Sequence, residues 1–482
     1  MENWLIKRAR LTPNRVAVQE KEQQLTFQEV ADQTKKIAAQ LNVVIETEQR
    51  IALIATNTIA SYLVIMAVQQ LGKTMVFINR RLSVDEINYQ LADADISVLI
   101  TDEDYHHQLK VDKQLTVSAL STEKSARLDL VENFPDDAVT SIMYTSGTTG
   151  KPKGVMQTFN NHFFSAMGSA LNLGLTADDA WLTAVPIFHI SGFSILMRGL
   201  IYGMRVVLLP KFDAHQANEL LVNHHITTMS VVPVMLKQLL KDLPEDVSYN
   251  SGFRTMLLGG GPTDRATLKR AQAHHIPIIQ SYGMTETASQ VIALDAEYAD
   301  EKLGSVGKPL FPVSLKIANH YGVPVKTGNI WIKSPTLTVG YLNQPNKLAE
   351  KCRDGWFNTE DLGYLDDDGF LFVQGREGDM ISSGGENIFP DEVESVYLKL
   401  PEIDNIVVVG VPDEQWGQVP VAIVIGSKQL SATDLKAYGR EKLAHYKVPK
   451  RFYFASDWHR NASGKTERIK FIAEITRLKE LK

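Results

Sequence analysis

Strand-like and helix-like patterns alternate through roughly the first 300 residues of the chain. The strand-like runs, such as residues 50–56 and 74–79, are short and almost continuously apolar, and an amphipathic stretch at 59–71 separates these two. Further runs of this kind are 97–101, 205–210, 227–233, 255–261 and 276–283. A strand without polar alternation is buried on both faces, as in parallel sheets covered by helices. The alternation therefore predicts an α/β fold with sheets rich in parallel strands.

Two helix starts in this part of the chain carry a capping box. Thr26 is followed three residues later by Glu29, and Ser83 by Glu86. In this pattern the hydroxyl accepts from the third backbone N–H while the carboxylate accepts from the cap's own N–H. The boxes predict helices that begin directly after residues 26 and 83, the first reaching about residue 41.

The character of the sequence changes after about residue 300. Glycines and turn residues become frequent, and the runs 329–334 and 369–376 resemble strands of hairpins or a small barrel. Beyond them, Pro390 is followed by acidic residues, which is typical of a helix N-terminus. We predict an N-terminal domain at 1–377 (αβ subdomains to about 300, a barrel-like subdomain at 301–377), a hinge at 378 and an α+β domain at 379–482.

Charge and hydropathy limit the classes of partner. The formal net charge is −6, which argues against a protein that binds nucleic acid or a membrane surface through a basic field. No apolar run reaches the ~18–20 residues of a membrane-spanning helix, and the N-terminus lacks the apolar region of a signal peptide. With a single cysteine, Cys352, no intrachain disulfide is possible. We expect a cytoplasmic protein whose partners are small molecules; the sequence allows a homo-oligomer without requiring one.

A stretch rich in small and cationic residues, YTSGTTGKPKG, occupies residues 144–154. Glycines let backbone N–H groups converge on an anion, and hydroxyls and lysines add donors. The spacing is not that of a Walker A loop, because only two residues separate Gly147 from Gly150 and Pro152 stands where Ser or Thr would hold magnesium. On these residues alone, a phosphate-binding loop and an ordinary solvated loop remain equal alternatives.

Four further features favour a nucleotide site. LLGGGPT (257–263) and QSYGMTETASQ (280–290) each follow an apolar strand, and open α/β sheets bind ligands at strand carboxyl ends. Glu286 is a lone acid among hydroxyls, which suits a magnesium ligand beside phosphates. Asp361 and Arg376 flank a predicted hairpin, where Asp361 could bind ribose hydroxyls or be an ordinary turn aspartate. Lys465, in NASGKTER, is by itself no more than a surface lysine in a glycine turn.

Taken together and in order, these stretches resemble the adenylate-forming superfamily of acyl-CoA synthetases, luciferases and peptide-synthetase adenylation domains. The motifs that carry the resemblance span the chain: YTSGTTGKPKG, QSYGMTE, WFNTEDLG, GREGDMISSGGENI and NASGKTER. QTFNNHFFSAMGSALNLGLT and PIFHISGFSILMRGLIYGM are more specifically similar to the 2-succinylbenzoate–CoA ligases of menaquinone biosynthesis.

The resemblance implies a large N-terminal domain, a small mobile C-terminal domain and two half-reactions. A carboxylate and ATP give an acyl-adenylate and diphosphate, and the CoA thiol then displaces AMP; ATP and CoA are co-substrates and Mg²⁺ is the cofactor. By motif, the ATP-binding residues would be Ser146, Thr148, Thr149, Lys151, Gly259, Gly260, Gly261, Pro262, Tyr282, Gly283, Asp361 and Arg376. Thr285 would contact the α-phosphate, Glu286 would hold Mg²⁺, and Lys465 would bridge the carboxylate and the α-phosphate.

The second half-reaction would use a different face of the C-terminal domain. The resemblance implies that this domain rotates about Gly378, a position where relatives often carry aspartate, lysine or serine. The segment 382–387 would then line the pantetheine tunnel, with Gly384, Gly385 and Glu386 as CoA-binding residues. Lys447 and Lys450 are candidates for the CoA phosphates, with solvated surface lysines as the alternative. A second departure from the family is Glu360, where glycine is common; its effect is not evident from the sequence.

The acid expected from the closer resemblance is 2-succinylbenzoate, which has an aromatic ring, a ketone and two carboxylates. The carboxylate that does not react needs a buried donor, since an unpaired buried anion is costly. We expect His189 near the pocket mouth, where it could also act catalytically, and Arg198, or a water that it orients, near this carboxylate. The alternative for Arg198 is a surface helix position. Ser191, Thr287, Ser289 and Gln290 complete the candidate pocket. The rival functions are an acyl- or aryl-CoA synthetase for another acid, an adenylation module that loads a carrier protein, and an inactive nucleotide-binding regulator.

Overall fold

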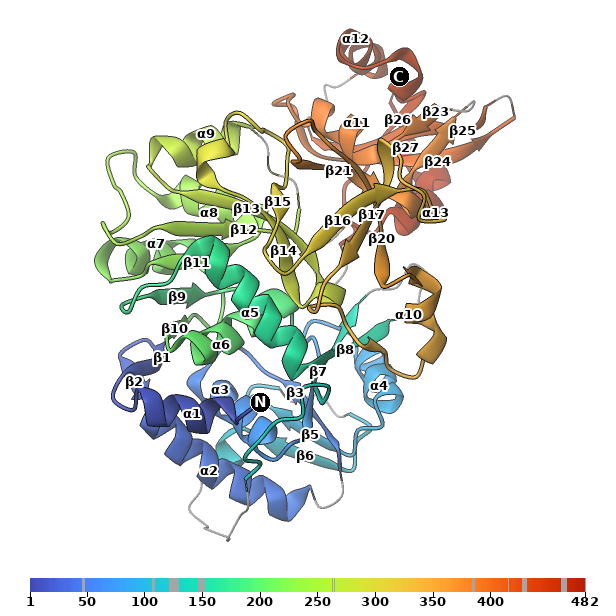
Figure 1. Ribbon diagram of the computed structural model, residues 1–482. Helices are drawn as coiled ribbons and strands as arrows, with labels where there is room; N and C mark the ends of the chain where they lie inside the picture. Colours follow the sequence, from blue (N-terminus) through green and yellow to red (C-terminus); the bar gives the residue numbers. More distant parts are fainter. Residues whose placement is uncertain are drawn as a thin grey trace. The chain divides into compact units, whose positions relative to one another are not determined.

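The computed structural model describes residues 1–45, 48–105, 109–120, 130–145, 152–261, 263, 265–383, 386–414, 416–426, 431–460 and 466–481, with backbone alone at 382, 386 and 387. These residues group into two compact units (Figure 1). The first unit comprises Met1–Leu315 and Ile332–Phe357, and the second comprises Lys316–Trp331 and Asn358–Lys482.

Most described strands of the first unit form two large sheets with parallel centres, antiparallel at both edges of the first sheet and at one edge of the second. One runs in the order β15 (Lys308–Pro309), β14 (Ser289–Leu294), β13 (Ile278–Met284), β12 (Thr255–Leu258), β11 (Thr228–Val231), β9 (Ala180–Thr183), β10 (Arg205–Leu208), β1 (Val16–Glu20) and β2 (Gln23–Thr26). The other runs β18 (Gly340–Tyr341), β8 (Lys153–Thr158), β7 (Val139–Thr145), β4 (Thr74–Phe77), β3 (Arg50–Ile54), β5 (Val98–Thr101) and β6 (Lys113–Thr116). The predicted parallel-rich α/β fold is confirmed.

Helices cover these sheets, and the apolar strands are buried as expected (Figure 1). The helices of the first unit are α1 (Trp4–Leu11), α2 (Phe27–Val44), α3 (Ile59–Gln70), α4 (Val84–Asp93), α5 (Phe159–Leu173), α6 (Ile190–Tyr202), α7 (Ala214–Asn223), α8 (Pro233–Asp242), α9 (Arg265–Ala273) and α10 (Pro345–Lys351). Both predicted capping boxes are present, at Thr26 before α2 and at Ser83 before α4. Helix α2 extends to Val44, three residues beyond the predicted end.

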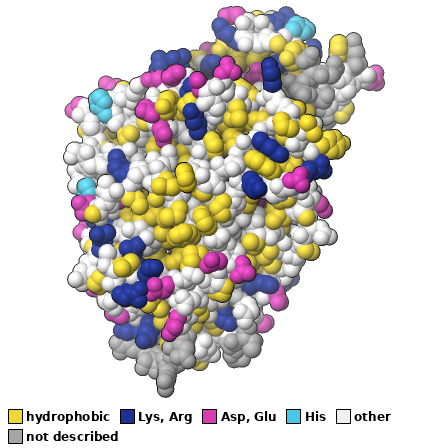
Figure 2. All heavy atoms as spheres, in the orientation of Figure 1, with side chains coloured by type: hydrophobic (Ala, Val, Ile, Leu, Met, Phe, Trp, Pro, Cys, Tyr) yellow, Lys and Arg dark blue, Asp and Glu magenta, His cyan; other side chains and the backbone are white. Residues whose placement is uncertain are grey.

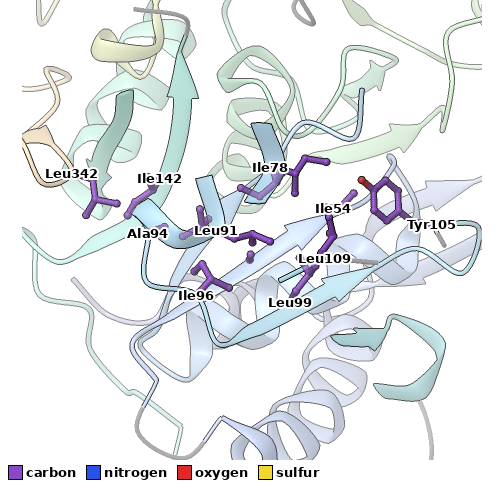
Figure 3. Packing of buried hydrophobic residues seen from close by; sticks show 13 residues of the cluster. Ile54, Ile78, Leu91, Ala94, Ile96, Leu99, Tyr105, Leu109, Ile142 and Leu342 are labelled. Atoms are coloured by element: carbon purple, nitrogen blue, oxygen red, sulfur yellow. The ribbon is translucent and has the colours of Figure 1, made fainter. Parts of the chain in front are cut away.

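The core of the second sheet shows why α4 folds where it does. Its buried residues Ile87 and Leu91 pack against the apolar strands β3, β4 and β5. Figure 3 shows Leu91 and Ile96 beside the strand residues Ile54 and Leu99. Complete burial of an aliphatic side chain contributes roughly 1.5–3 kcal/mol, so this cluster is a main source of stability for the sheet that carries β7 and β8.

The stretch expected to form hairpins or a small barrel forms a five-stranded sheet. Its order is β16 (Ser314–Ala318), β17 (Thr327–Lys333), β20 (Trp356–Leu365) and β19 (Cys352–Arg353), with β21 (Leu371–Arg376) also paired with β20. Among the described residues this order does not close on itself. Frequent turns predict short strands, but barrel closure depends on pairing between the first and last strands, which the local pattern does not encode.

The C-terminal part of the second unit is the expected α+β structure. Its sheet contains β23 (Glu386–Ile388), β22 (Ile381–Ser383), β25 (Gly417–Gly426), β26 (Arg451–Phe454) and β27 (Lys479–Glu480), and β24 (Ile403–Asp413) pairs with β25. Its helices are α11 (Pro390–Tyr397), α12 (Ala432–Lys442) and α13 (Arg468–Glu474). Two apolar clusters lie on its strands, one around Tyr397 and Phe452, the other around Val409 and Phe471.

Figure 2 shows basic and acidic side chains interspersed over the visible face of the described residues. Interspersed charges produce no extended basic field for a polyanion. None of the helices in the described part of the chain is both long enough and apolar enough to cross a membrane.

Candidate active site

Some of the predicted site residues lie outside the described ranges. These are Ser146, Thr148, Thr149, Lys151, Pro262, Gly384, Gly385 and Lys465. Glu386 is described only as part of the backbone of β23. Their roles stay predictions, and the site is built from the residues that the structure describes.

The turn that carries Thr285 and Glu286 is tightly constrained. It follows β13 as a single 3₁₀ turn, Thr285–Thr287, and the chain then reverses into β14. Ala288 and Ser289 have φ angles of 50° and 101°, values that an L-residue adopts only when its surroundings compel it. A Cβ on Gly283 would lie 2.1 Å from the Ser289 carbonyl oxygen, so only glycine fits there. The reversal presents Thr285 and Glu286 together at the carboxyl end of β13.

Residues from distant segments hold this turn. The Gln157 side chain donates to the Thr285 carbonyl at 2.6 Å, and the backbone N–H of Thr338 donates to the Glu286 carbonyl at 2.7 Å. The Tyr341 hydroxyl donates to Oε1 of Glu286 at 3.0 Å. Mg²⁺ takes one or two carboxylates plus phosphate oxygens. The half-buried Glu286 carboxylate fits that requirement, because Tyr341 orients it through a hydrogen bond to Oε1.

The glycines after β12 lie beside this turn. Strands β12 and β13 are parallel neighbours, with Leu258 opposite Gln280, so the residues that follow them emerge at the same sheet edge. Gly260 has a φ of 82°, which favours glycine, and Gly260 and Gly261 are exposed. Tyr282 comes from the end of β13 and is half-buried. The structure therefore brings together Gly259–Gly261 and Tyr282, as the motifs predicted.

Helix α6 contributes the most unusual side chain of the site, Arg198. It is only 1% exposed, and its guanidinium carbon lies 5.4 Å from the centroid of the Trp181 ring. Its Nε and Nη2 have no hydrogen-bond partner within the described part of the chain. Burial lowers the pKa of Arg198, but the guanidinium remains protonated in proteins. The alternative of a surface arginine is wrong: the side chain is a buried cation with two unused donors.

The other predicted pocket residues differ in how they are placed. His189 is half-buried at the N-terminus of α6 and packs edge-on against Phe188, whereas Ser191 is exposed on the first turn. The Ser289 hydroxyl lies 3.3 Å from that of Ser194, a buried residue of the stretch 186–204 that was not among the predicted pocket residues. Buried Gln290 has an Oε1 without a partner among the described residues. The Thr287 hydroxyl is used within the turn, where it bonds Met284 and Ser289.

Asp361 and Arg376 come together in the second unit. They are opposite each other in the β20–β21 ladder, and Nε of Arg376 donates to Oδ1 of Asp361 at 3.0 Å. Asp361 is 7% exposed. Glu360, the residue before it, has a φ of 64°. This left-handed conformation is a physical reason why glycine suits the position in relatives.

The remaining predictions in the second unit concern CoA and the hinge. Lys447 pairs with Glu392 at 2.6 Å, while Lys450 is exposed. Gly378 lies within the turn Glu377–Asp379, and a Cβ there would meet no atom within 4 Å. The pairing of Lys447 means that a phosphate would have to compete with a carboxylate, so Lys450 is the more accessible of the two lysines.

Three further contributors to the site were not singled out from the sequence: Gln157, His162 and Tyr341. Each is at most 2% exposed and acts through contacts between segments far apart in the chain. A usable signal existed only for His162, a polar residue on the buried face of an amphipathic helix.

Two family models match this chain. Residues 5–342 match the AMP-binding enzyme family, and residues 392–465 match the AMP-binding enzyme C-terminal domain. A 2-succinylbenzoate–CoA ligase of Geobacillus sp. (strain WCH70) is 45% identical over 469 residues, which are 96% of this chain and 95% of the ligase.

Two solved structures of o-succinylbenzoate CoA synthetase from Bacillus subtilis are also similar, each with 40% identity. The complex with the acyl-adenylate intermediate OSB-AMP has a TM-score of 0.93, and the match covers 98% of this chain and 98% of that one. The complex with ATP and magnesium ion has a TM-score of 0.92, covering 98% of this chain and 99% of that one.

Proposed function

The chain belongs to the AMP-binding enzyme family, and from this premise we infer that it is an AMP-forming ligase that joins 2-succinylbenzoate to CoA. The products are 2-succinylbenzoyl-CoA, AMP and diphosphate, and the reaction belongs to menaquinone biosynthesis. The similar ligases and synthetase, aligned over nearly their whole length, support both the acid and the adenylate route.

The reaction proceeds in two displacements. A carboxylate oxygen of the acid attacks the α-phosphorus of ATP, and diphosphate leaves with the electrons of the broken P–O bond. The CoA sulfur then attacks the acyl carbonyl, AMP leaves, and the thiol proton passes to solvent. Both steps bring anions together, so the protein's main contribution is positioning and electrostatic stabilisation. When bound, Mg²⁺ neutralises part of the phosphate charge.

The observation that carries the choice of acid is the buried Arg198. A buried cation without a partner is costly, and breaking a buried charge pair costs several kcal/mol. A ligand anion would supply the missing partner. 2-Succinylbenzoate has a second carboxylate that does not react, whereas a simple fatty or aryl acid has none. The unused Nε and Nη2 of Arg198 therefore favour a dicarboxylic acid over a monocarboxylic one.

We assign the individual roles as follows. Thr285 contacts the α-phosphate, and Glu286 would hold Mg²⁺. Asp361 and Arg376 bind the ribose. The adenine is flanked by Gly259–Gly261 and Tyr282. Lys465 bridges the two reacting groups in the first step, and His189 lines the mouth of the acid pocket. Residues 146–151 surround the β- and γ-phosphates.

The domain organisation is part of the proposal. An N-terminal domain at 1–377 and a C-terminal domain at 379–482 turn about Gly378, which lets Lys465 serve the first step and the segment 382–387 serve the second. Both co-substrates, ATP and CoA, are abundant in the cytoplasm, and we propose that the enzyme acts there. Its working form could be a homo-oligomer, which size-exclusion chromatography with light scattering would test.

An exchange assay tests the function directly. Purified protein with Mg²⁺, labelled diphosphate and a panel of acids should form labelled ATP fastest with 2-succinylbenzoate. Mass spectrometry after addition of CoA should detect 2-succinylbenzoyl-CoA. Preference for another acid by orders of magnitude would favour the rival acyl- or aryl-CoA synthetase. Exchange without any acyl-CoA would favour a carrier-loading module, and no exchange with any acid would favour an inactive regulator.

A further inference from the structure

A chain of buried hydrogen bonds runs from α5 to the Thr285–Glu286 turn. Nε2 of His162 lies 2.9 Å from the Ser141 hydroxyl, which lies 2.9 Å from Oε1 of Gln157. Nε2 of Gln157 donates to the Thr285 carbonyl at 2.6 Å. Ser141 and Gln157 are fully buried and His162 is 2% exposed. Such networks are worth most when every member is satisfied; here Nδ1 of His162 has no partner among the described residues.

The chain links two elements of the nucleotide site. Ser141 on β7 and Gln157 on β8 face each other as register partners, and β7 and β8 are the two strands that flank residues 146–151. Thr285 follows β13, which belongs to the other large sheet of the same unit. Gln157 therefore joins the hairpin that carries the predicted phosphate loop directly to the turn that carries Glu286.

The direction of the hydrogen bonds can be assigned from the last acceptor. A carbonyl only accepts, so the amide nitrogen of Gln157 must face Thr285 and its oxygen must face Ser141. The Ser141 hydroxyl must then donate to Gln157, and Nε2 of His162 must donate to Ser141. Burial, together with the positive charge of Arg198, lowers the pKa of His162 to about 3. The ring is thus neutral, with its proton on Nε2.

The donor-to-acceptor direction of this hydrogen-bond chain defines the role of His162. A hydroxyl can donate or accept, and a His162 ring that donates from Nε2 leaves the Ser141 hydroxyl proton for the Gln157 oxygen. His162 therefore supports the orientation that the Thr285 carbonyl already requires of the Gln157 amide. The ring is itself held by edge-on packing against Phe193 of α6, at 5.0 Å between centroids.

We propose that Gln157 is a positioning residue for Mg·ATP, oriented by Ser141 and His162. The inference rests on the proposed function, because the role of the Thr285–Glu286 turn in binding ATP and Mg²⁺ is part of it. The expected size of the effect is that of supporting contacts around metal ligands, where substitutions cost about 10- to 100-fold in affinity or activity.

The test measures Mg·ATP binding separately from turnover. Gln157→Leu removes both hydrogen bonds, and we expect the Mg·ATP affinity, measured by calorimetry and by the ligand-induced rise in melting temperature, to fall about 10- to 100-fold. The KM for the acid should change little. Gln157→Glu, which replaces the donor with an acceptor, should be at least as impaired. His162→Gln, which can restore a donor, should be less impaired than His162→Phe.

A matched control comes from Gln69. This buried glutamine on α3 donates to the hydroxyl of Thr140, the residue before Ser141, but does not touch the turn. Gln69→Leu should lower the melting temperature of the free protein and leave Mg·ATP affinity unchanged. If Gln157→Leu does not fold, Ser141→Ala removes the hydrogen bond that orients the Gln157 amide, with a smaller packing change.

Two results would overturn the proposal: equal Mg·ATP affinity in the folded Gln157 (or Ser141) and Gln69 variants, or equal impairment of His162→Gln and His162→Phe. Failure of the proposed function has a different signature. The wild-type protein would then bind Mg·ATP but exchange diphosphate only with some other acid, or with none. The Mg·ATP affinities of the variants could still be measured and ranked, so the role of Gln157 would be tested independently.

Discussion

In the proposed function, Arg198 binds a ligand at the expense of the stability of the folded chain. Its charge is fully buried, and its contact with the Trp181 ring replaces only part of the lost hydration. Two of its donors are unused among the described residues. A residue kept for stability would have these donors satisfied, so the arrangement indicates a site prepared for an anion.

Replacing Arg198 with methionine should therefore have opposite effects on stability and on catalysis. The free protein should become more stable, because a buried charge without a partner is removed. The KM for the acid, 2-succinylbenzoate, should rise by about 30-fold or more, equivalent to about 2 kcal/mol for losing one partner of a buried charge pair, while the KM for Mg·ATP stays the same. Thermal unfolding and steady-state kinetics measure both effects.

Arg205 provides the matched control for this prediction. It lies on β10, and its guanidinium donates to the Gln19 side chain and to the His225 carbonyl. Arg205→Met should lose stability without changing the KM for the acid. An Arg198 variant that behaved in the same way would show that the buried arginine is structural.

The sequence motifs identified residues whose roles are local, and missed those whose roles depend on tertiary contacts. Glu286, Asp361 and Gly259–Gly261 stand in distinctive glycine- or hydroxyl-rich stretches. Gln157 opens the quoted stretch 157–176, but no local signal indicates its bond to a carbonyl 128 residues away. For Arg198 a signal was present: it is the one charged residue of a largely apolar stretch, Ile190–Tyr202, and such a stretch favours burial.

At the level of elements, Arg468 connects the first turn of α13 with α11. Its Nη1 donates to Oε1 of Glu394 and to the Val408 carbonyl, and its Nη2 donates to Asp391. Nε also lies 3.7 Å from Asp379. Burial raises the pKa of Glu394 and the charge of Arg468 opposes that rise. The arginine thus favours the ionised form of a largely buried carboxylate.

Arg468→Met should destabilise the protein in a pH-dependent way. Near neutral pH the ionised Glu394 would lose its partner, at a cost of about 2–3 kcal/mol, below that of a fully buried pair because its side chain is 14% exposed. Without the arginine, the pKa of Glu394 in the folded state rises further. As the pH falls through that raised pKa, Glu394 becomes protonated and neutral, so the difference from wild type should shrink.

Urea unfolding of the wild type and the variant at neutral and mildly acidic pH measures this difference. Lys470 is the control, because its pair with Glu467 lies on the exposed face of the same helix. Lys470→Met should cost little at either pH. A stability loss in Arg468→Met that did not change with pH would contradict the role given to Glu394.

Element boundaries were largely predictable, whereas sheet membership was not. The capping boxes at Thr26 and Ser83 and the proline at Pro390 marked helix starts, because those signals act within one turn of chain. No local signal says that β1 pairs with β10, some 190 residues later, or that the strands divide between two large sheets. Such pairing is decided by which apolar faces can be buried together, and this depends on the whole chain.

At the scale of the molecule, the proposed mechanism requires one C-terminal domain to serve two steps. Lys465→Ala should therefore slow adenylation severely, by about two orders of magnitude or more, since removal of one preorganised donor to a developing charge costs 10²–10³-fold. CoA transfer from supplied 2-succinylbenzoyl-adenylate should be retained. Diphosphate exchange and acyl-CoA formation measure the two steps separately. Equal loss in both would contradict a lysine that acts in the first step alone.

A substitution at Gly378 tests whether the C-terminal domain must turn between the two half-reactions, because this residue contacts no reacting group in the proposed mechanism. A side chain fits at this position, because a Cβ there would meet no atom within 4 Å. Glycine's advantage is then conformational: a hinge must reach two sets of backbone angles, and glycine reaches them at least cost. Gly378→Pro, which fixes φ near −65°, should preserve adenylation and slow CoA transfer. Gly378→Ala should fold normally. If its rate of CoA transfer falls, the hinge requires backbone φ and ψ angles that glycine adopts and alanine avoids. Normal rates of both half-reactions in the proline variant would mean that the chain turns at another residue.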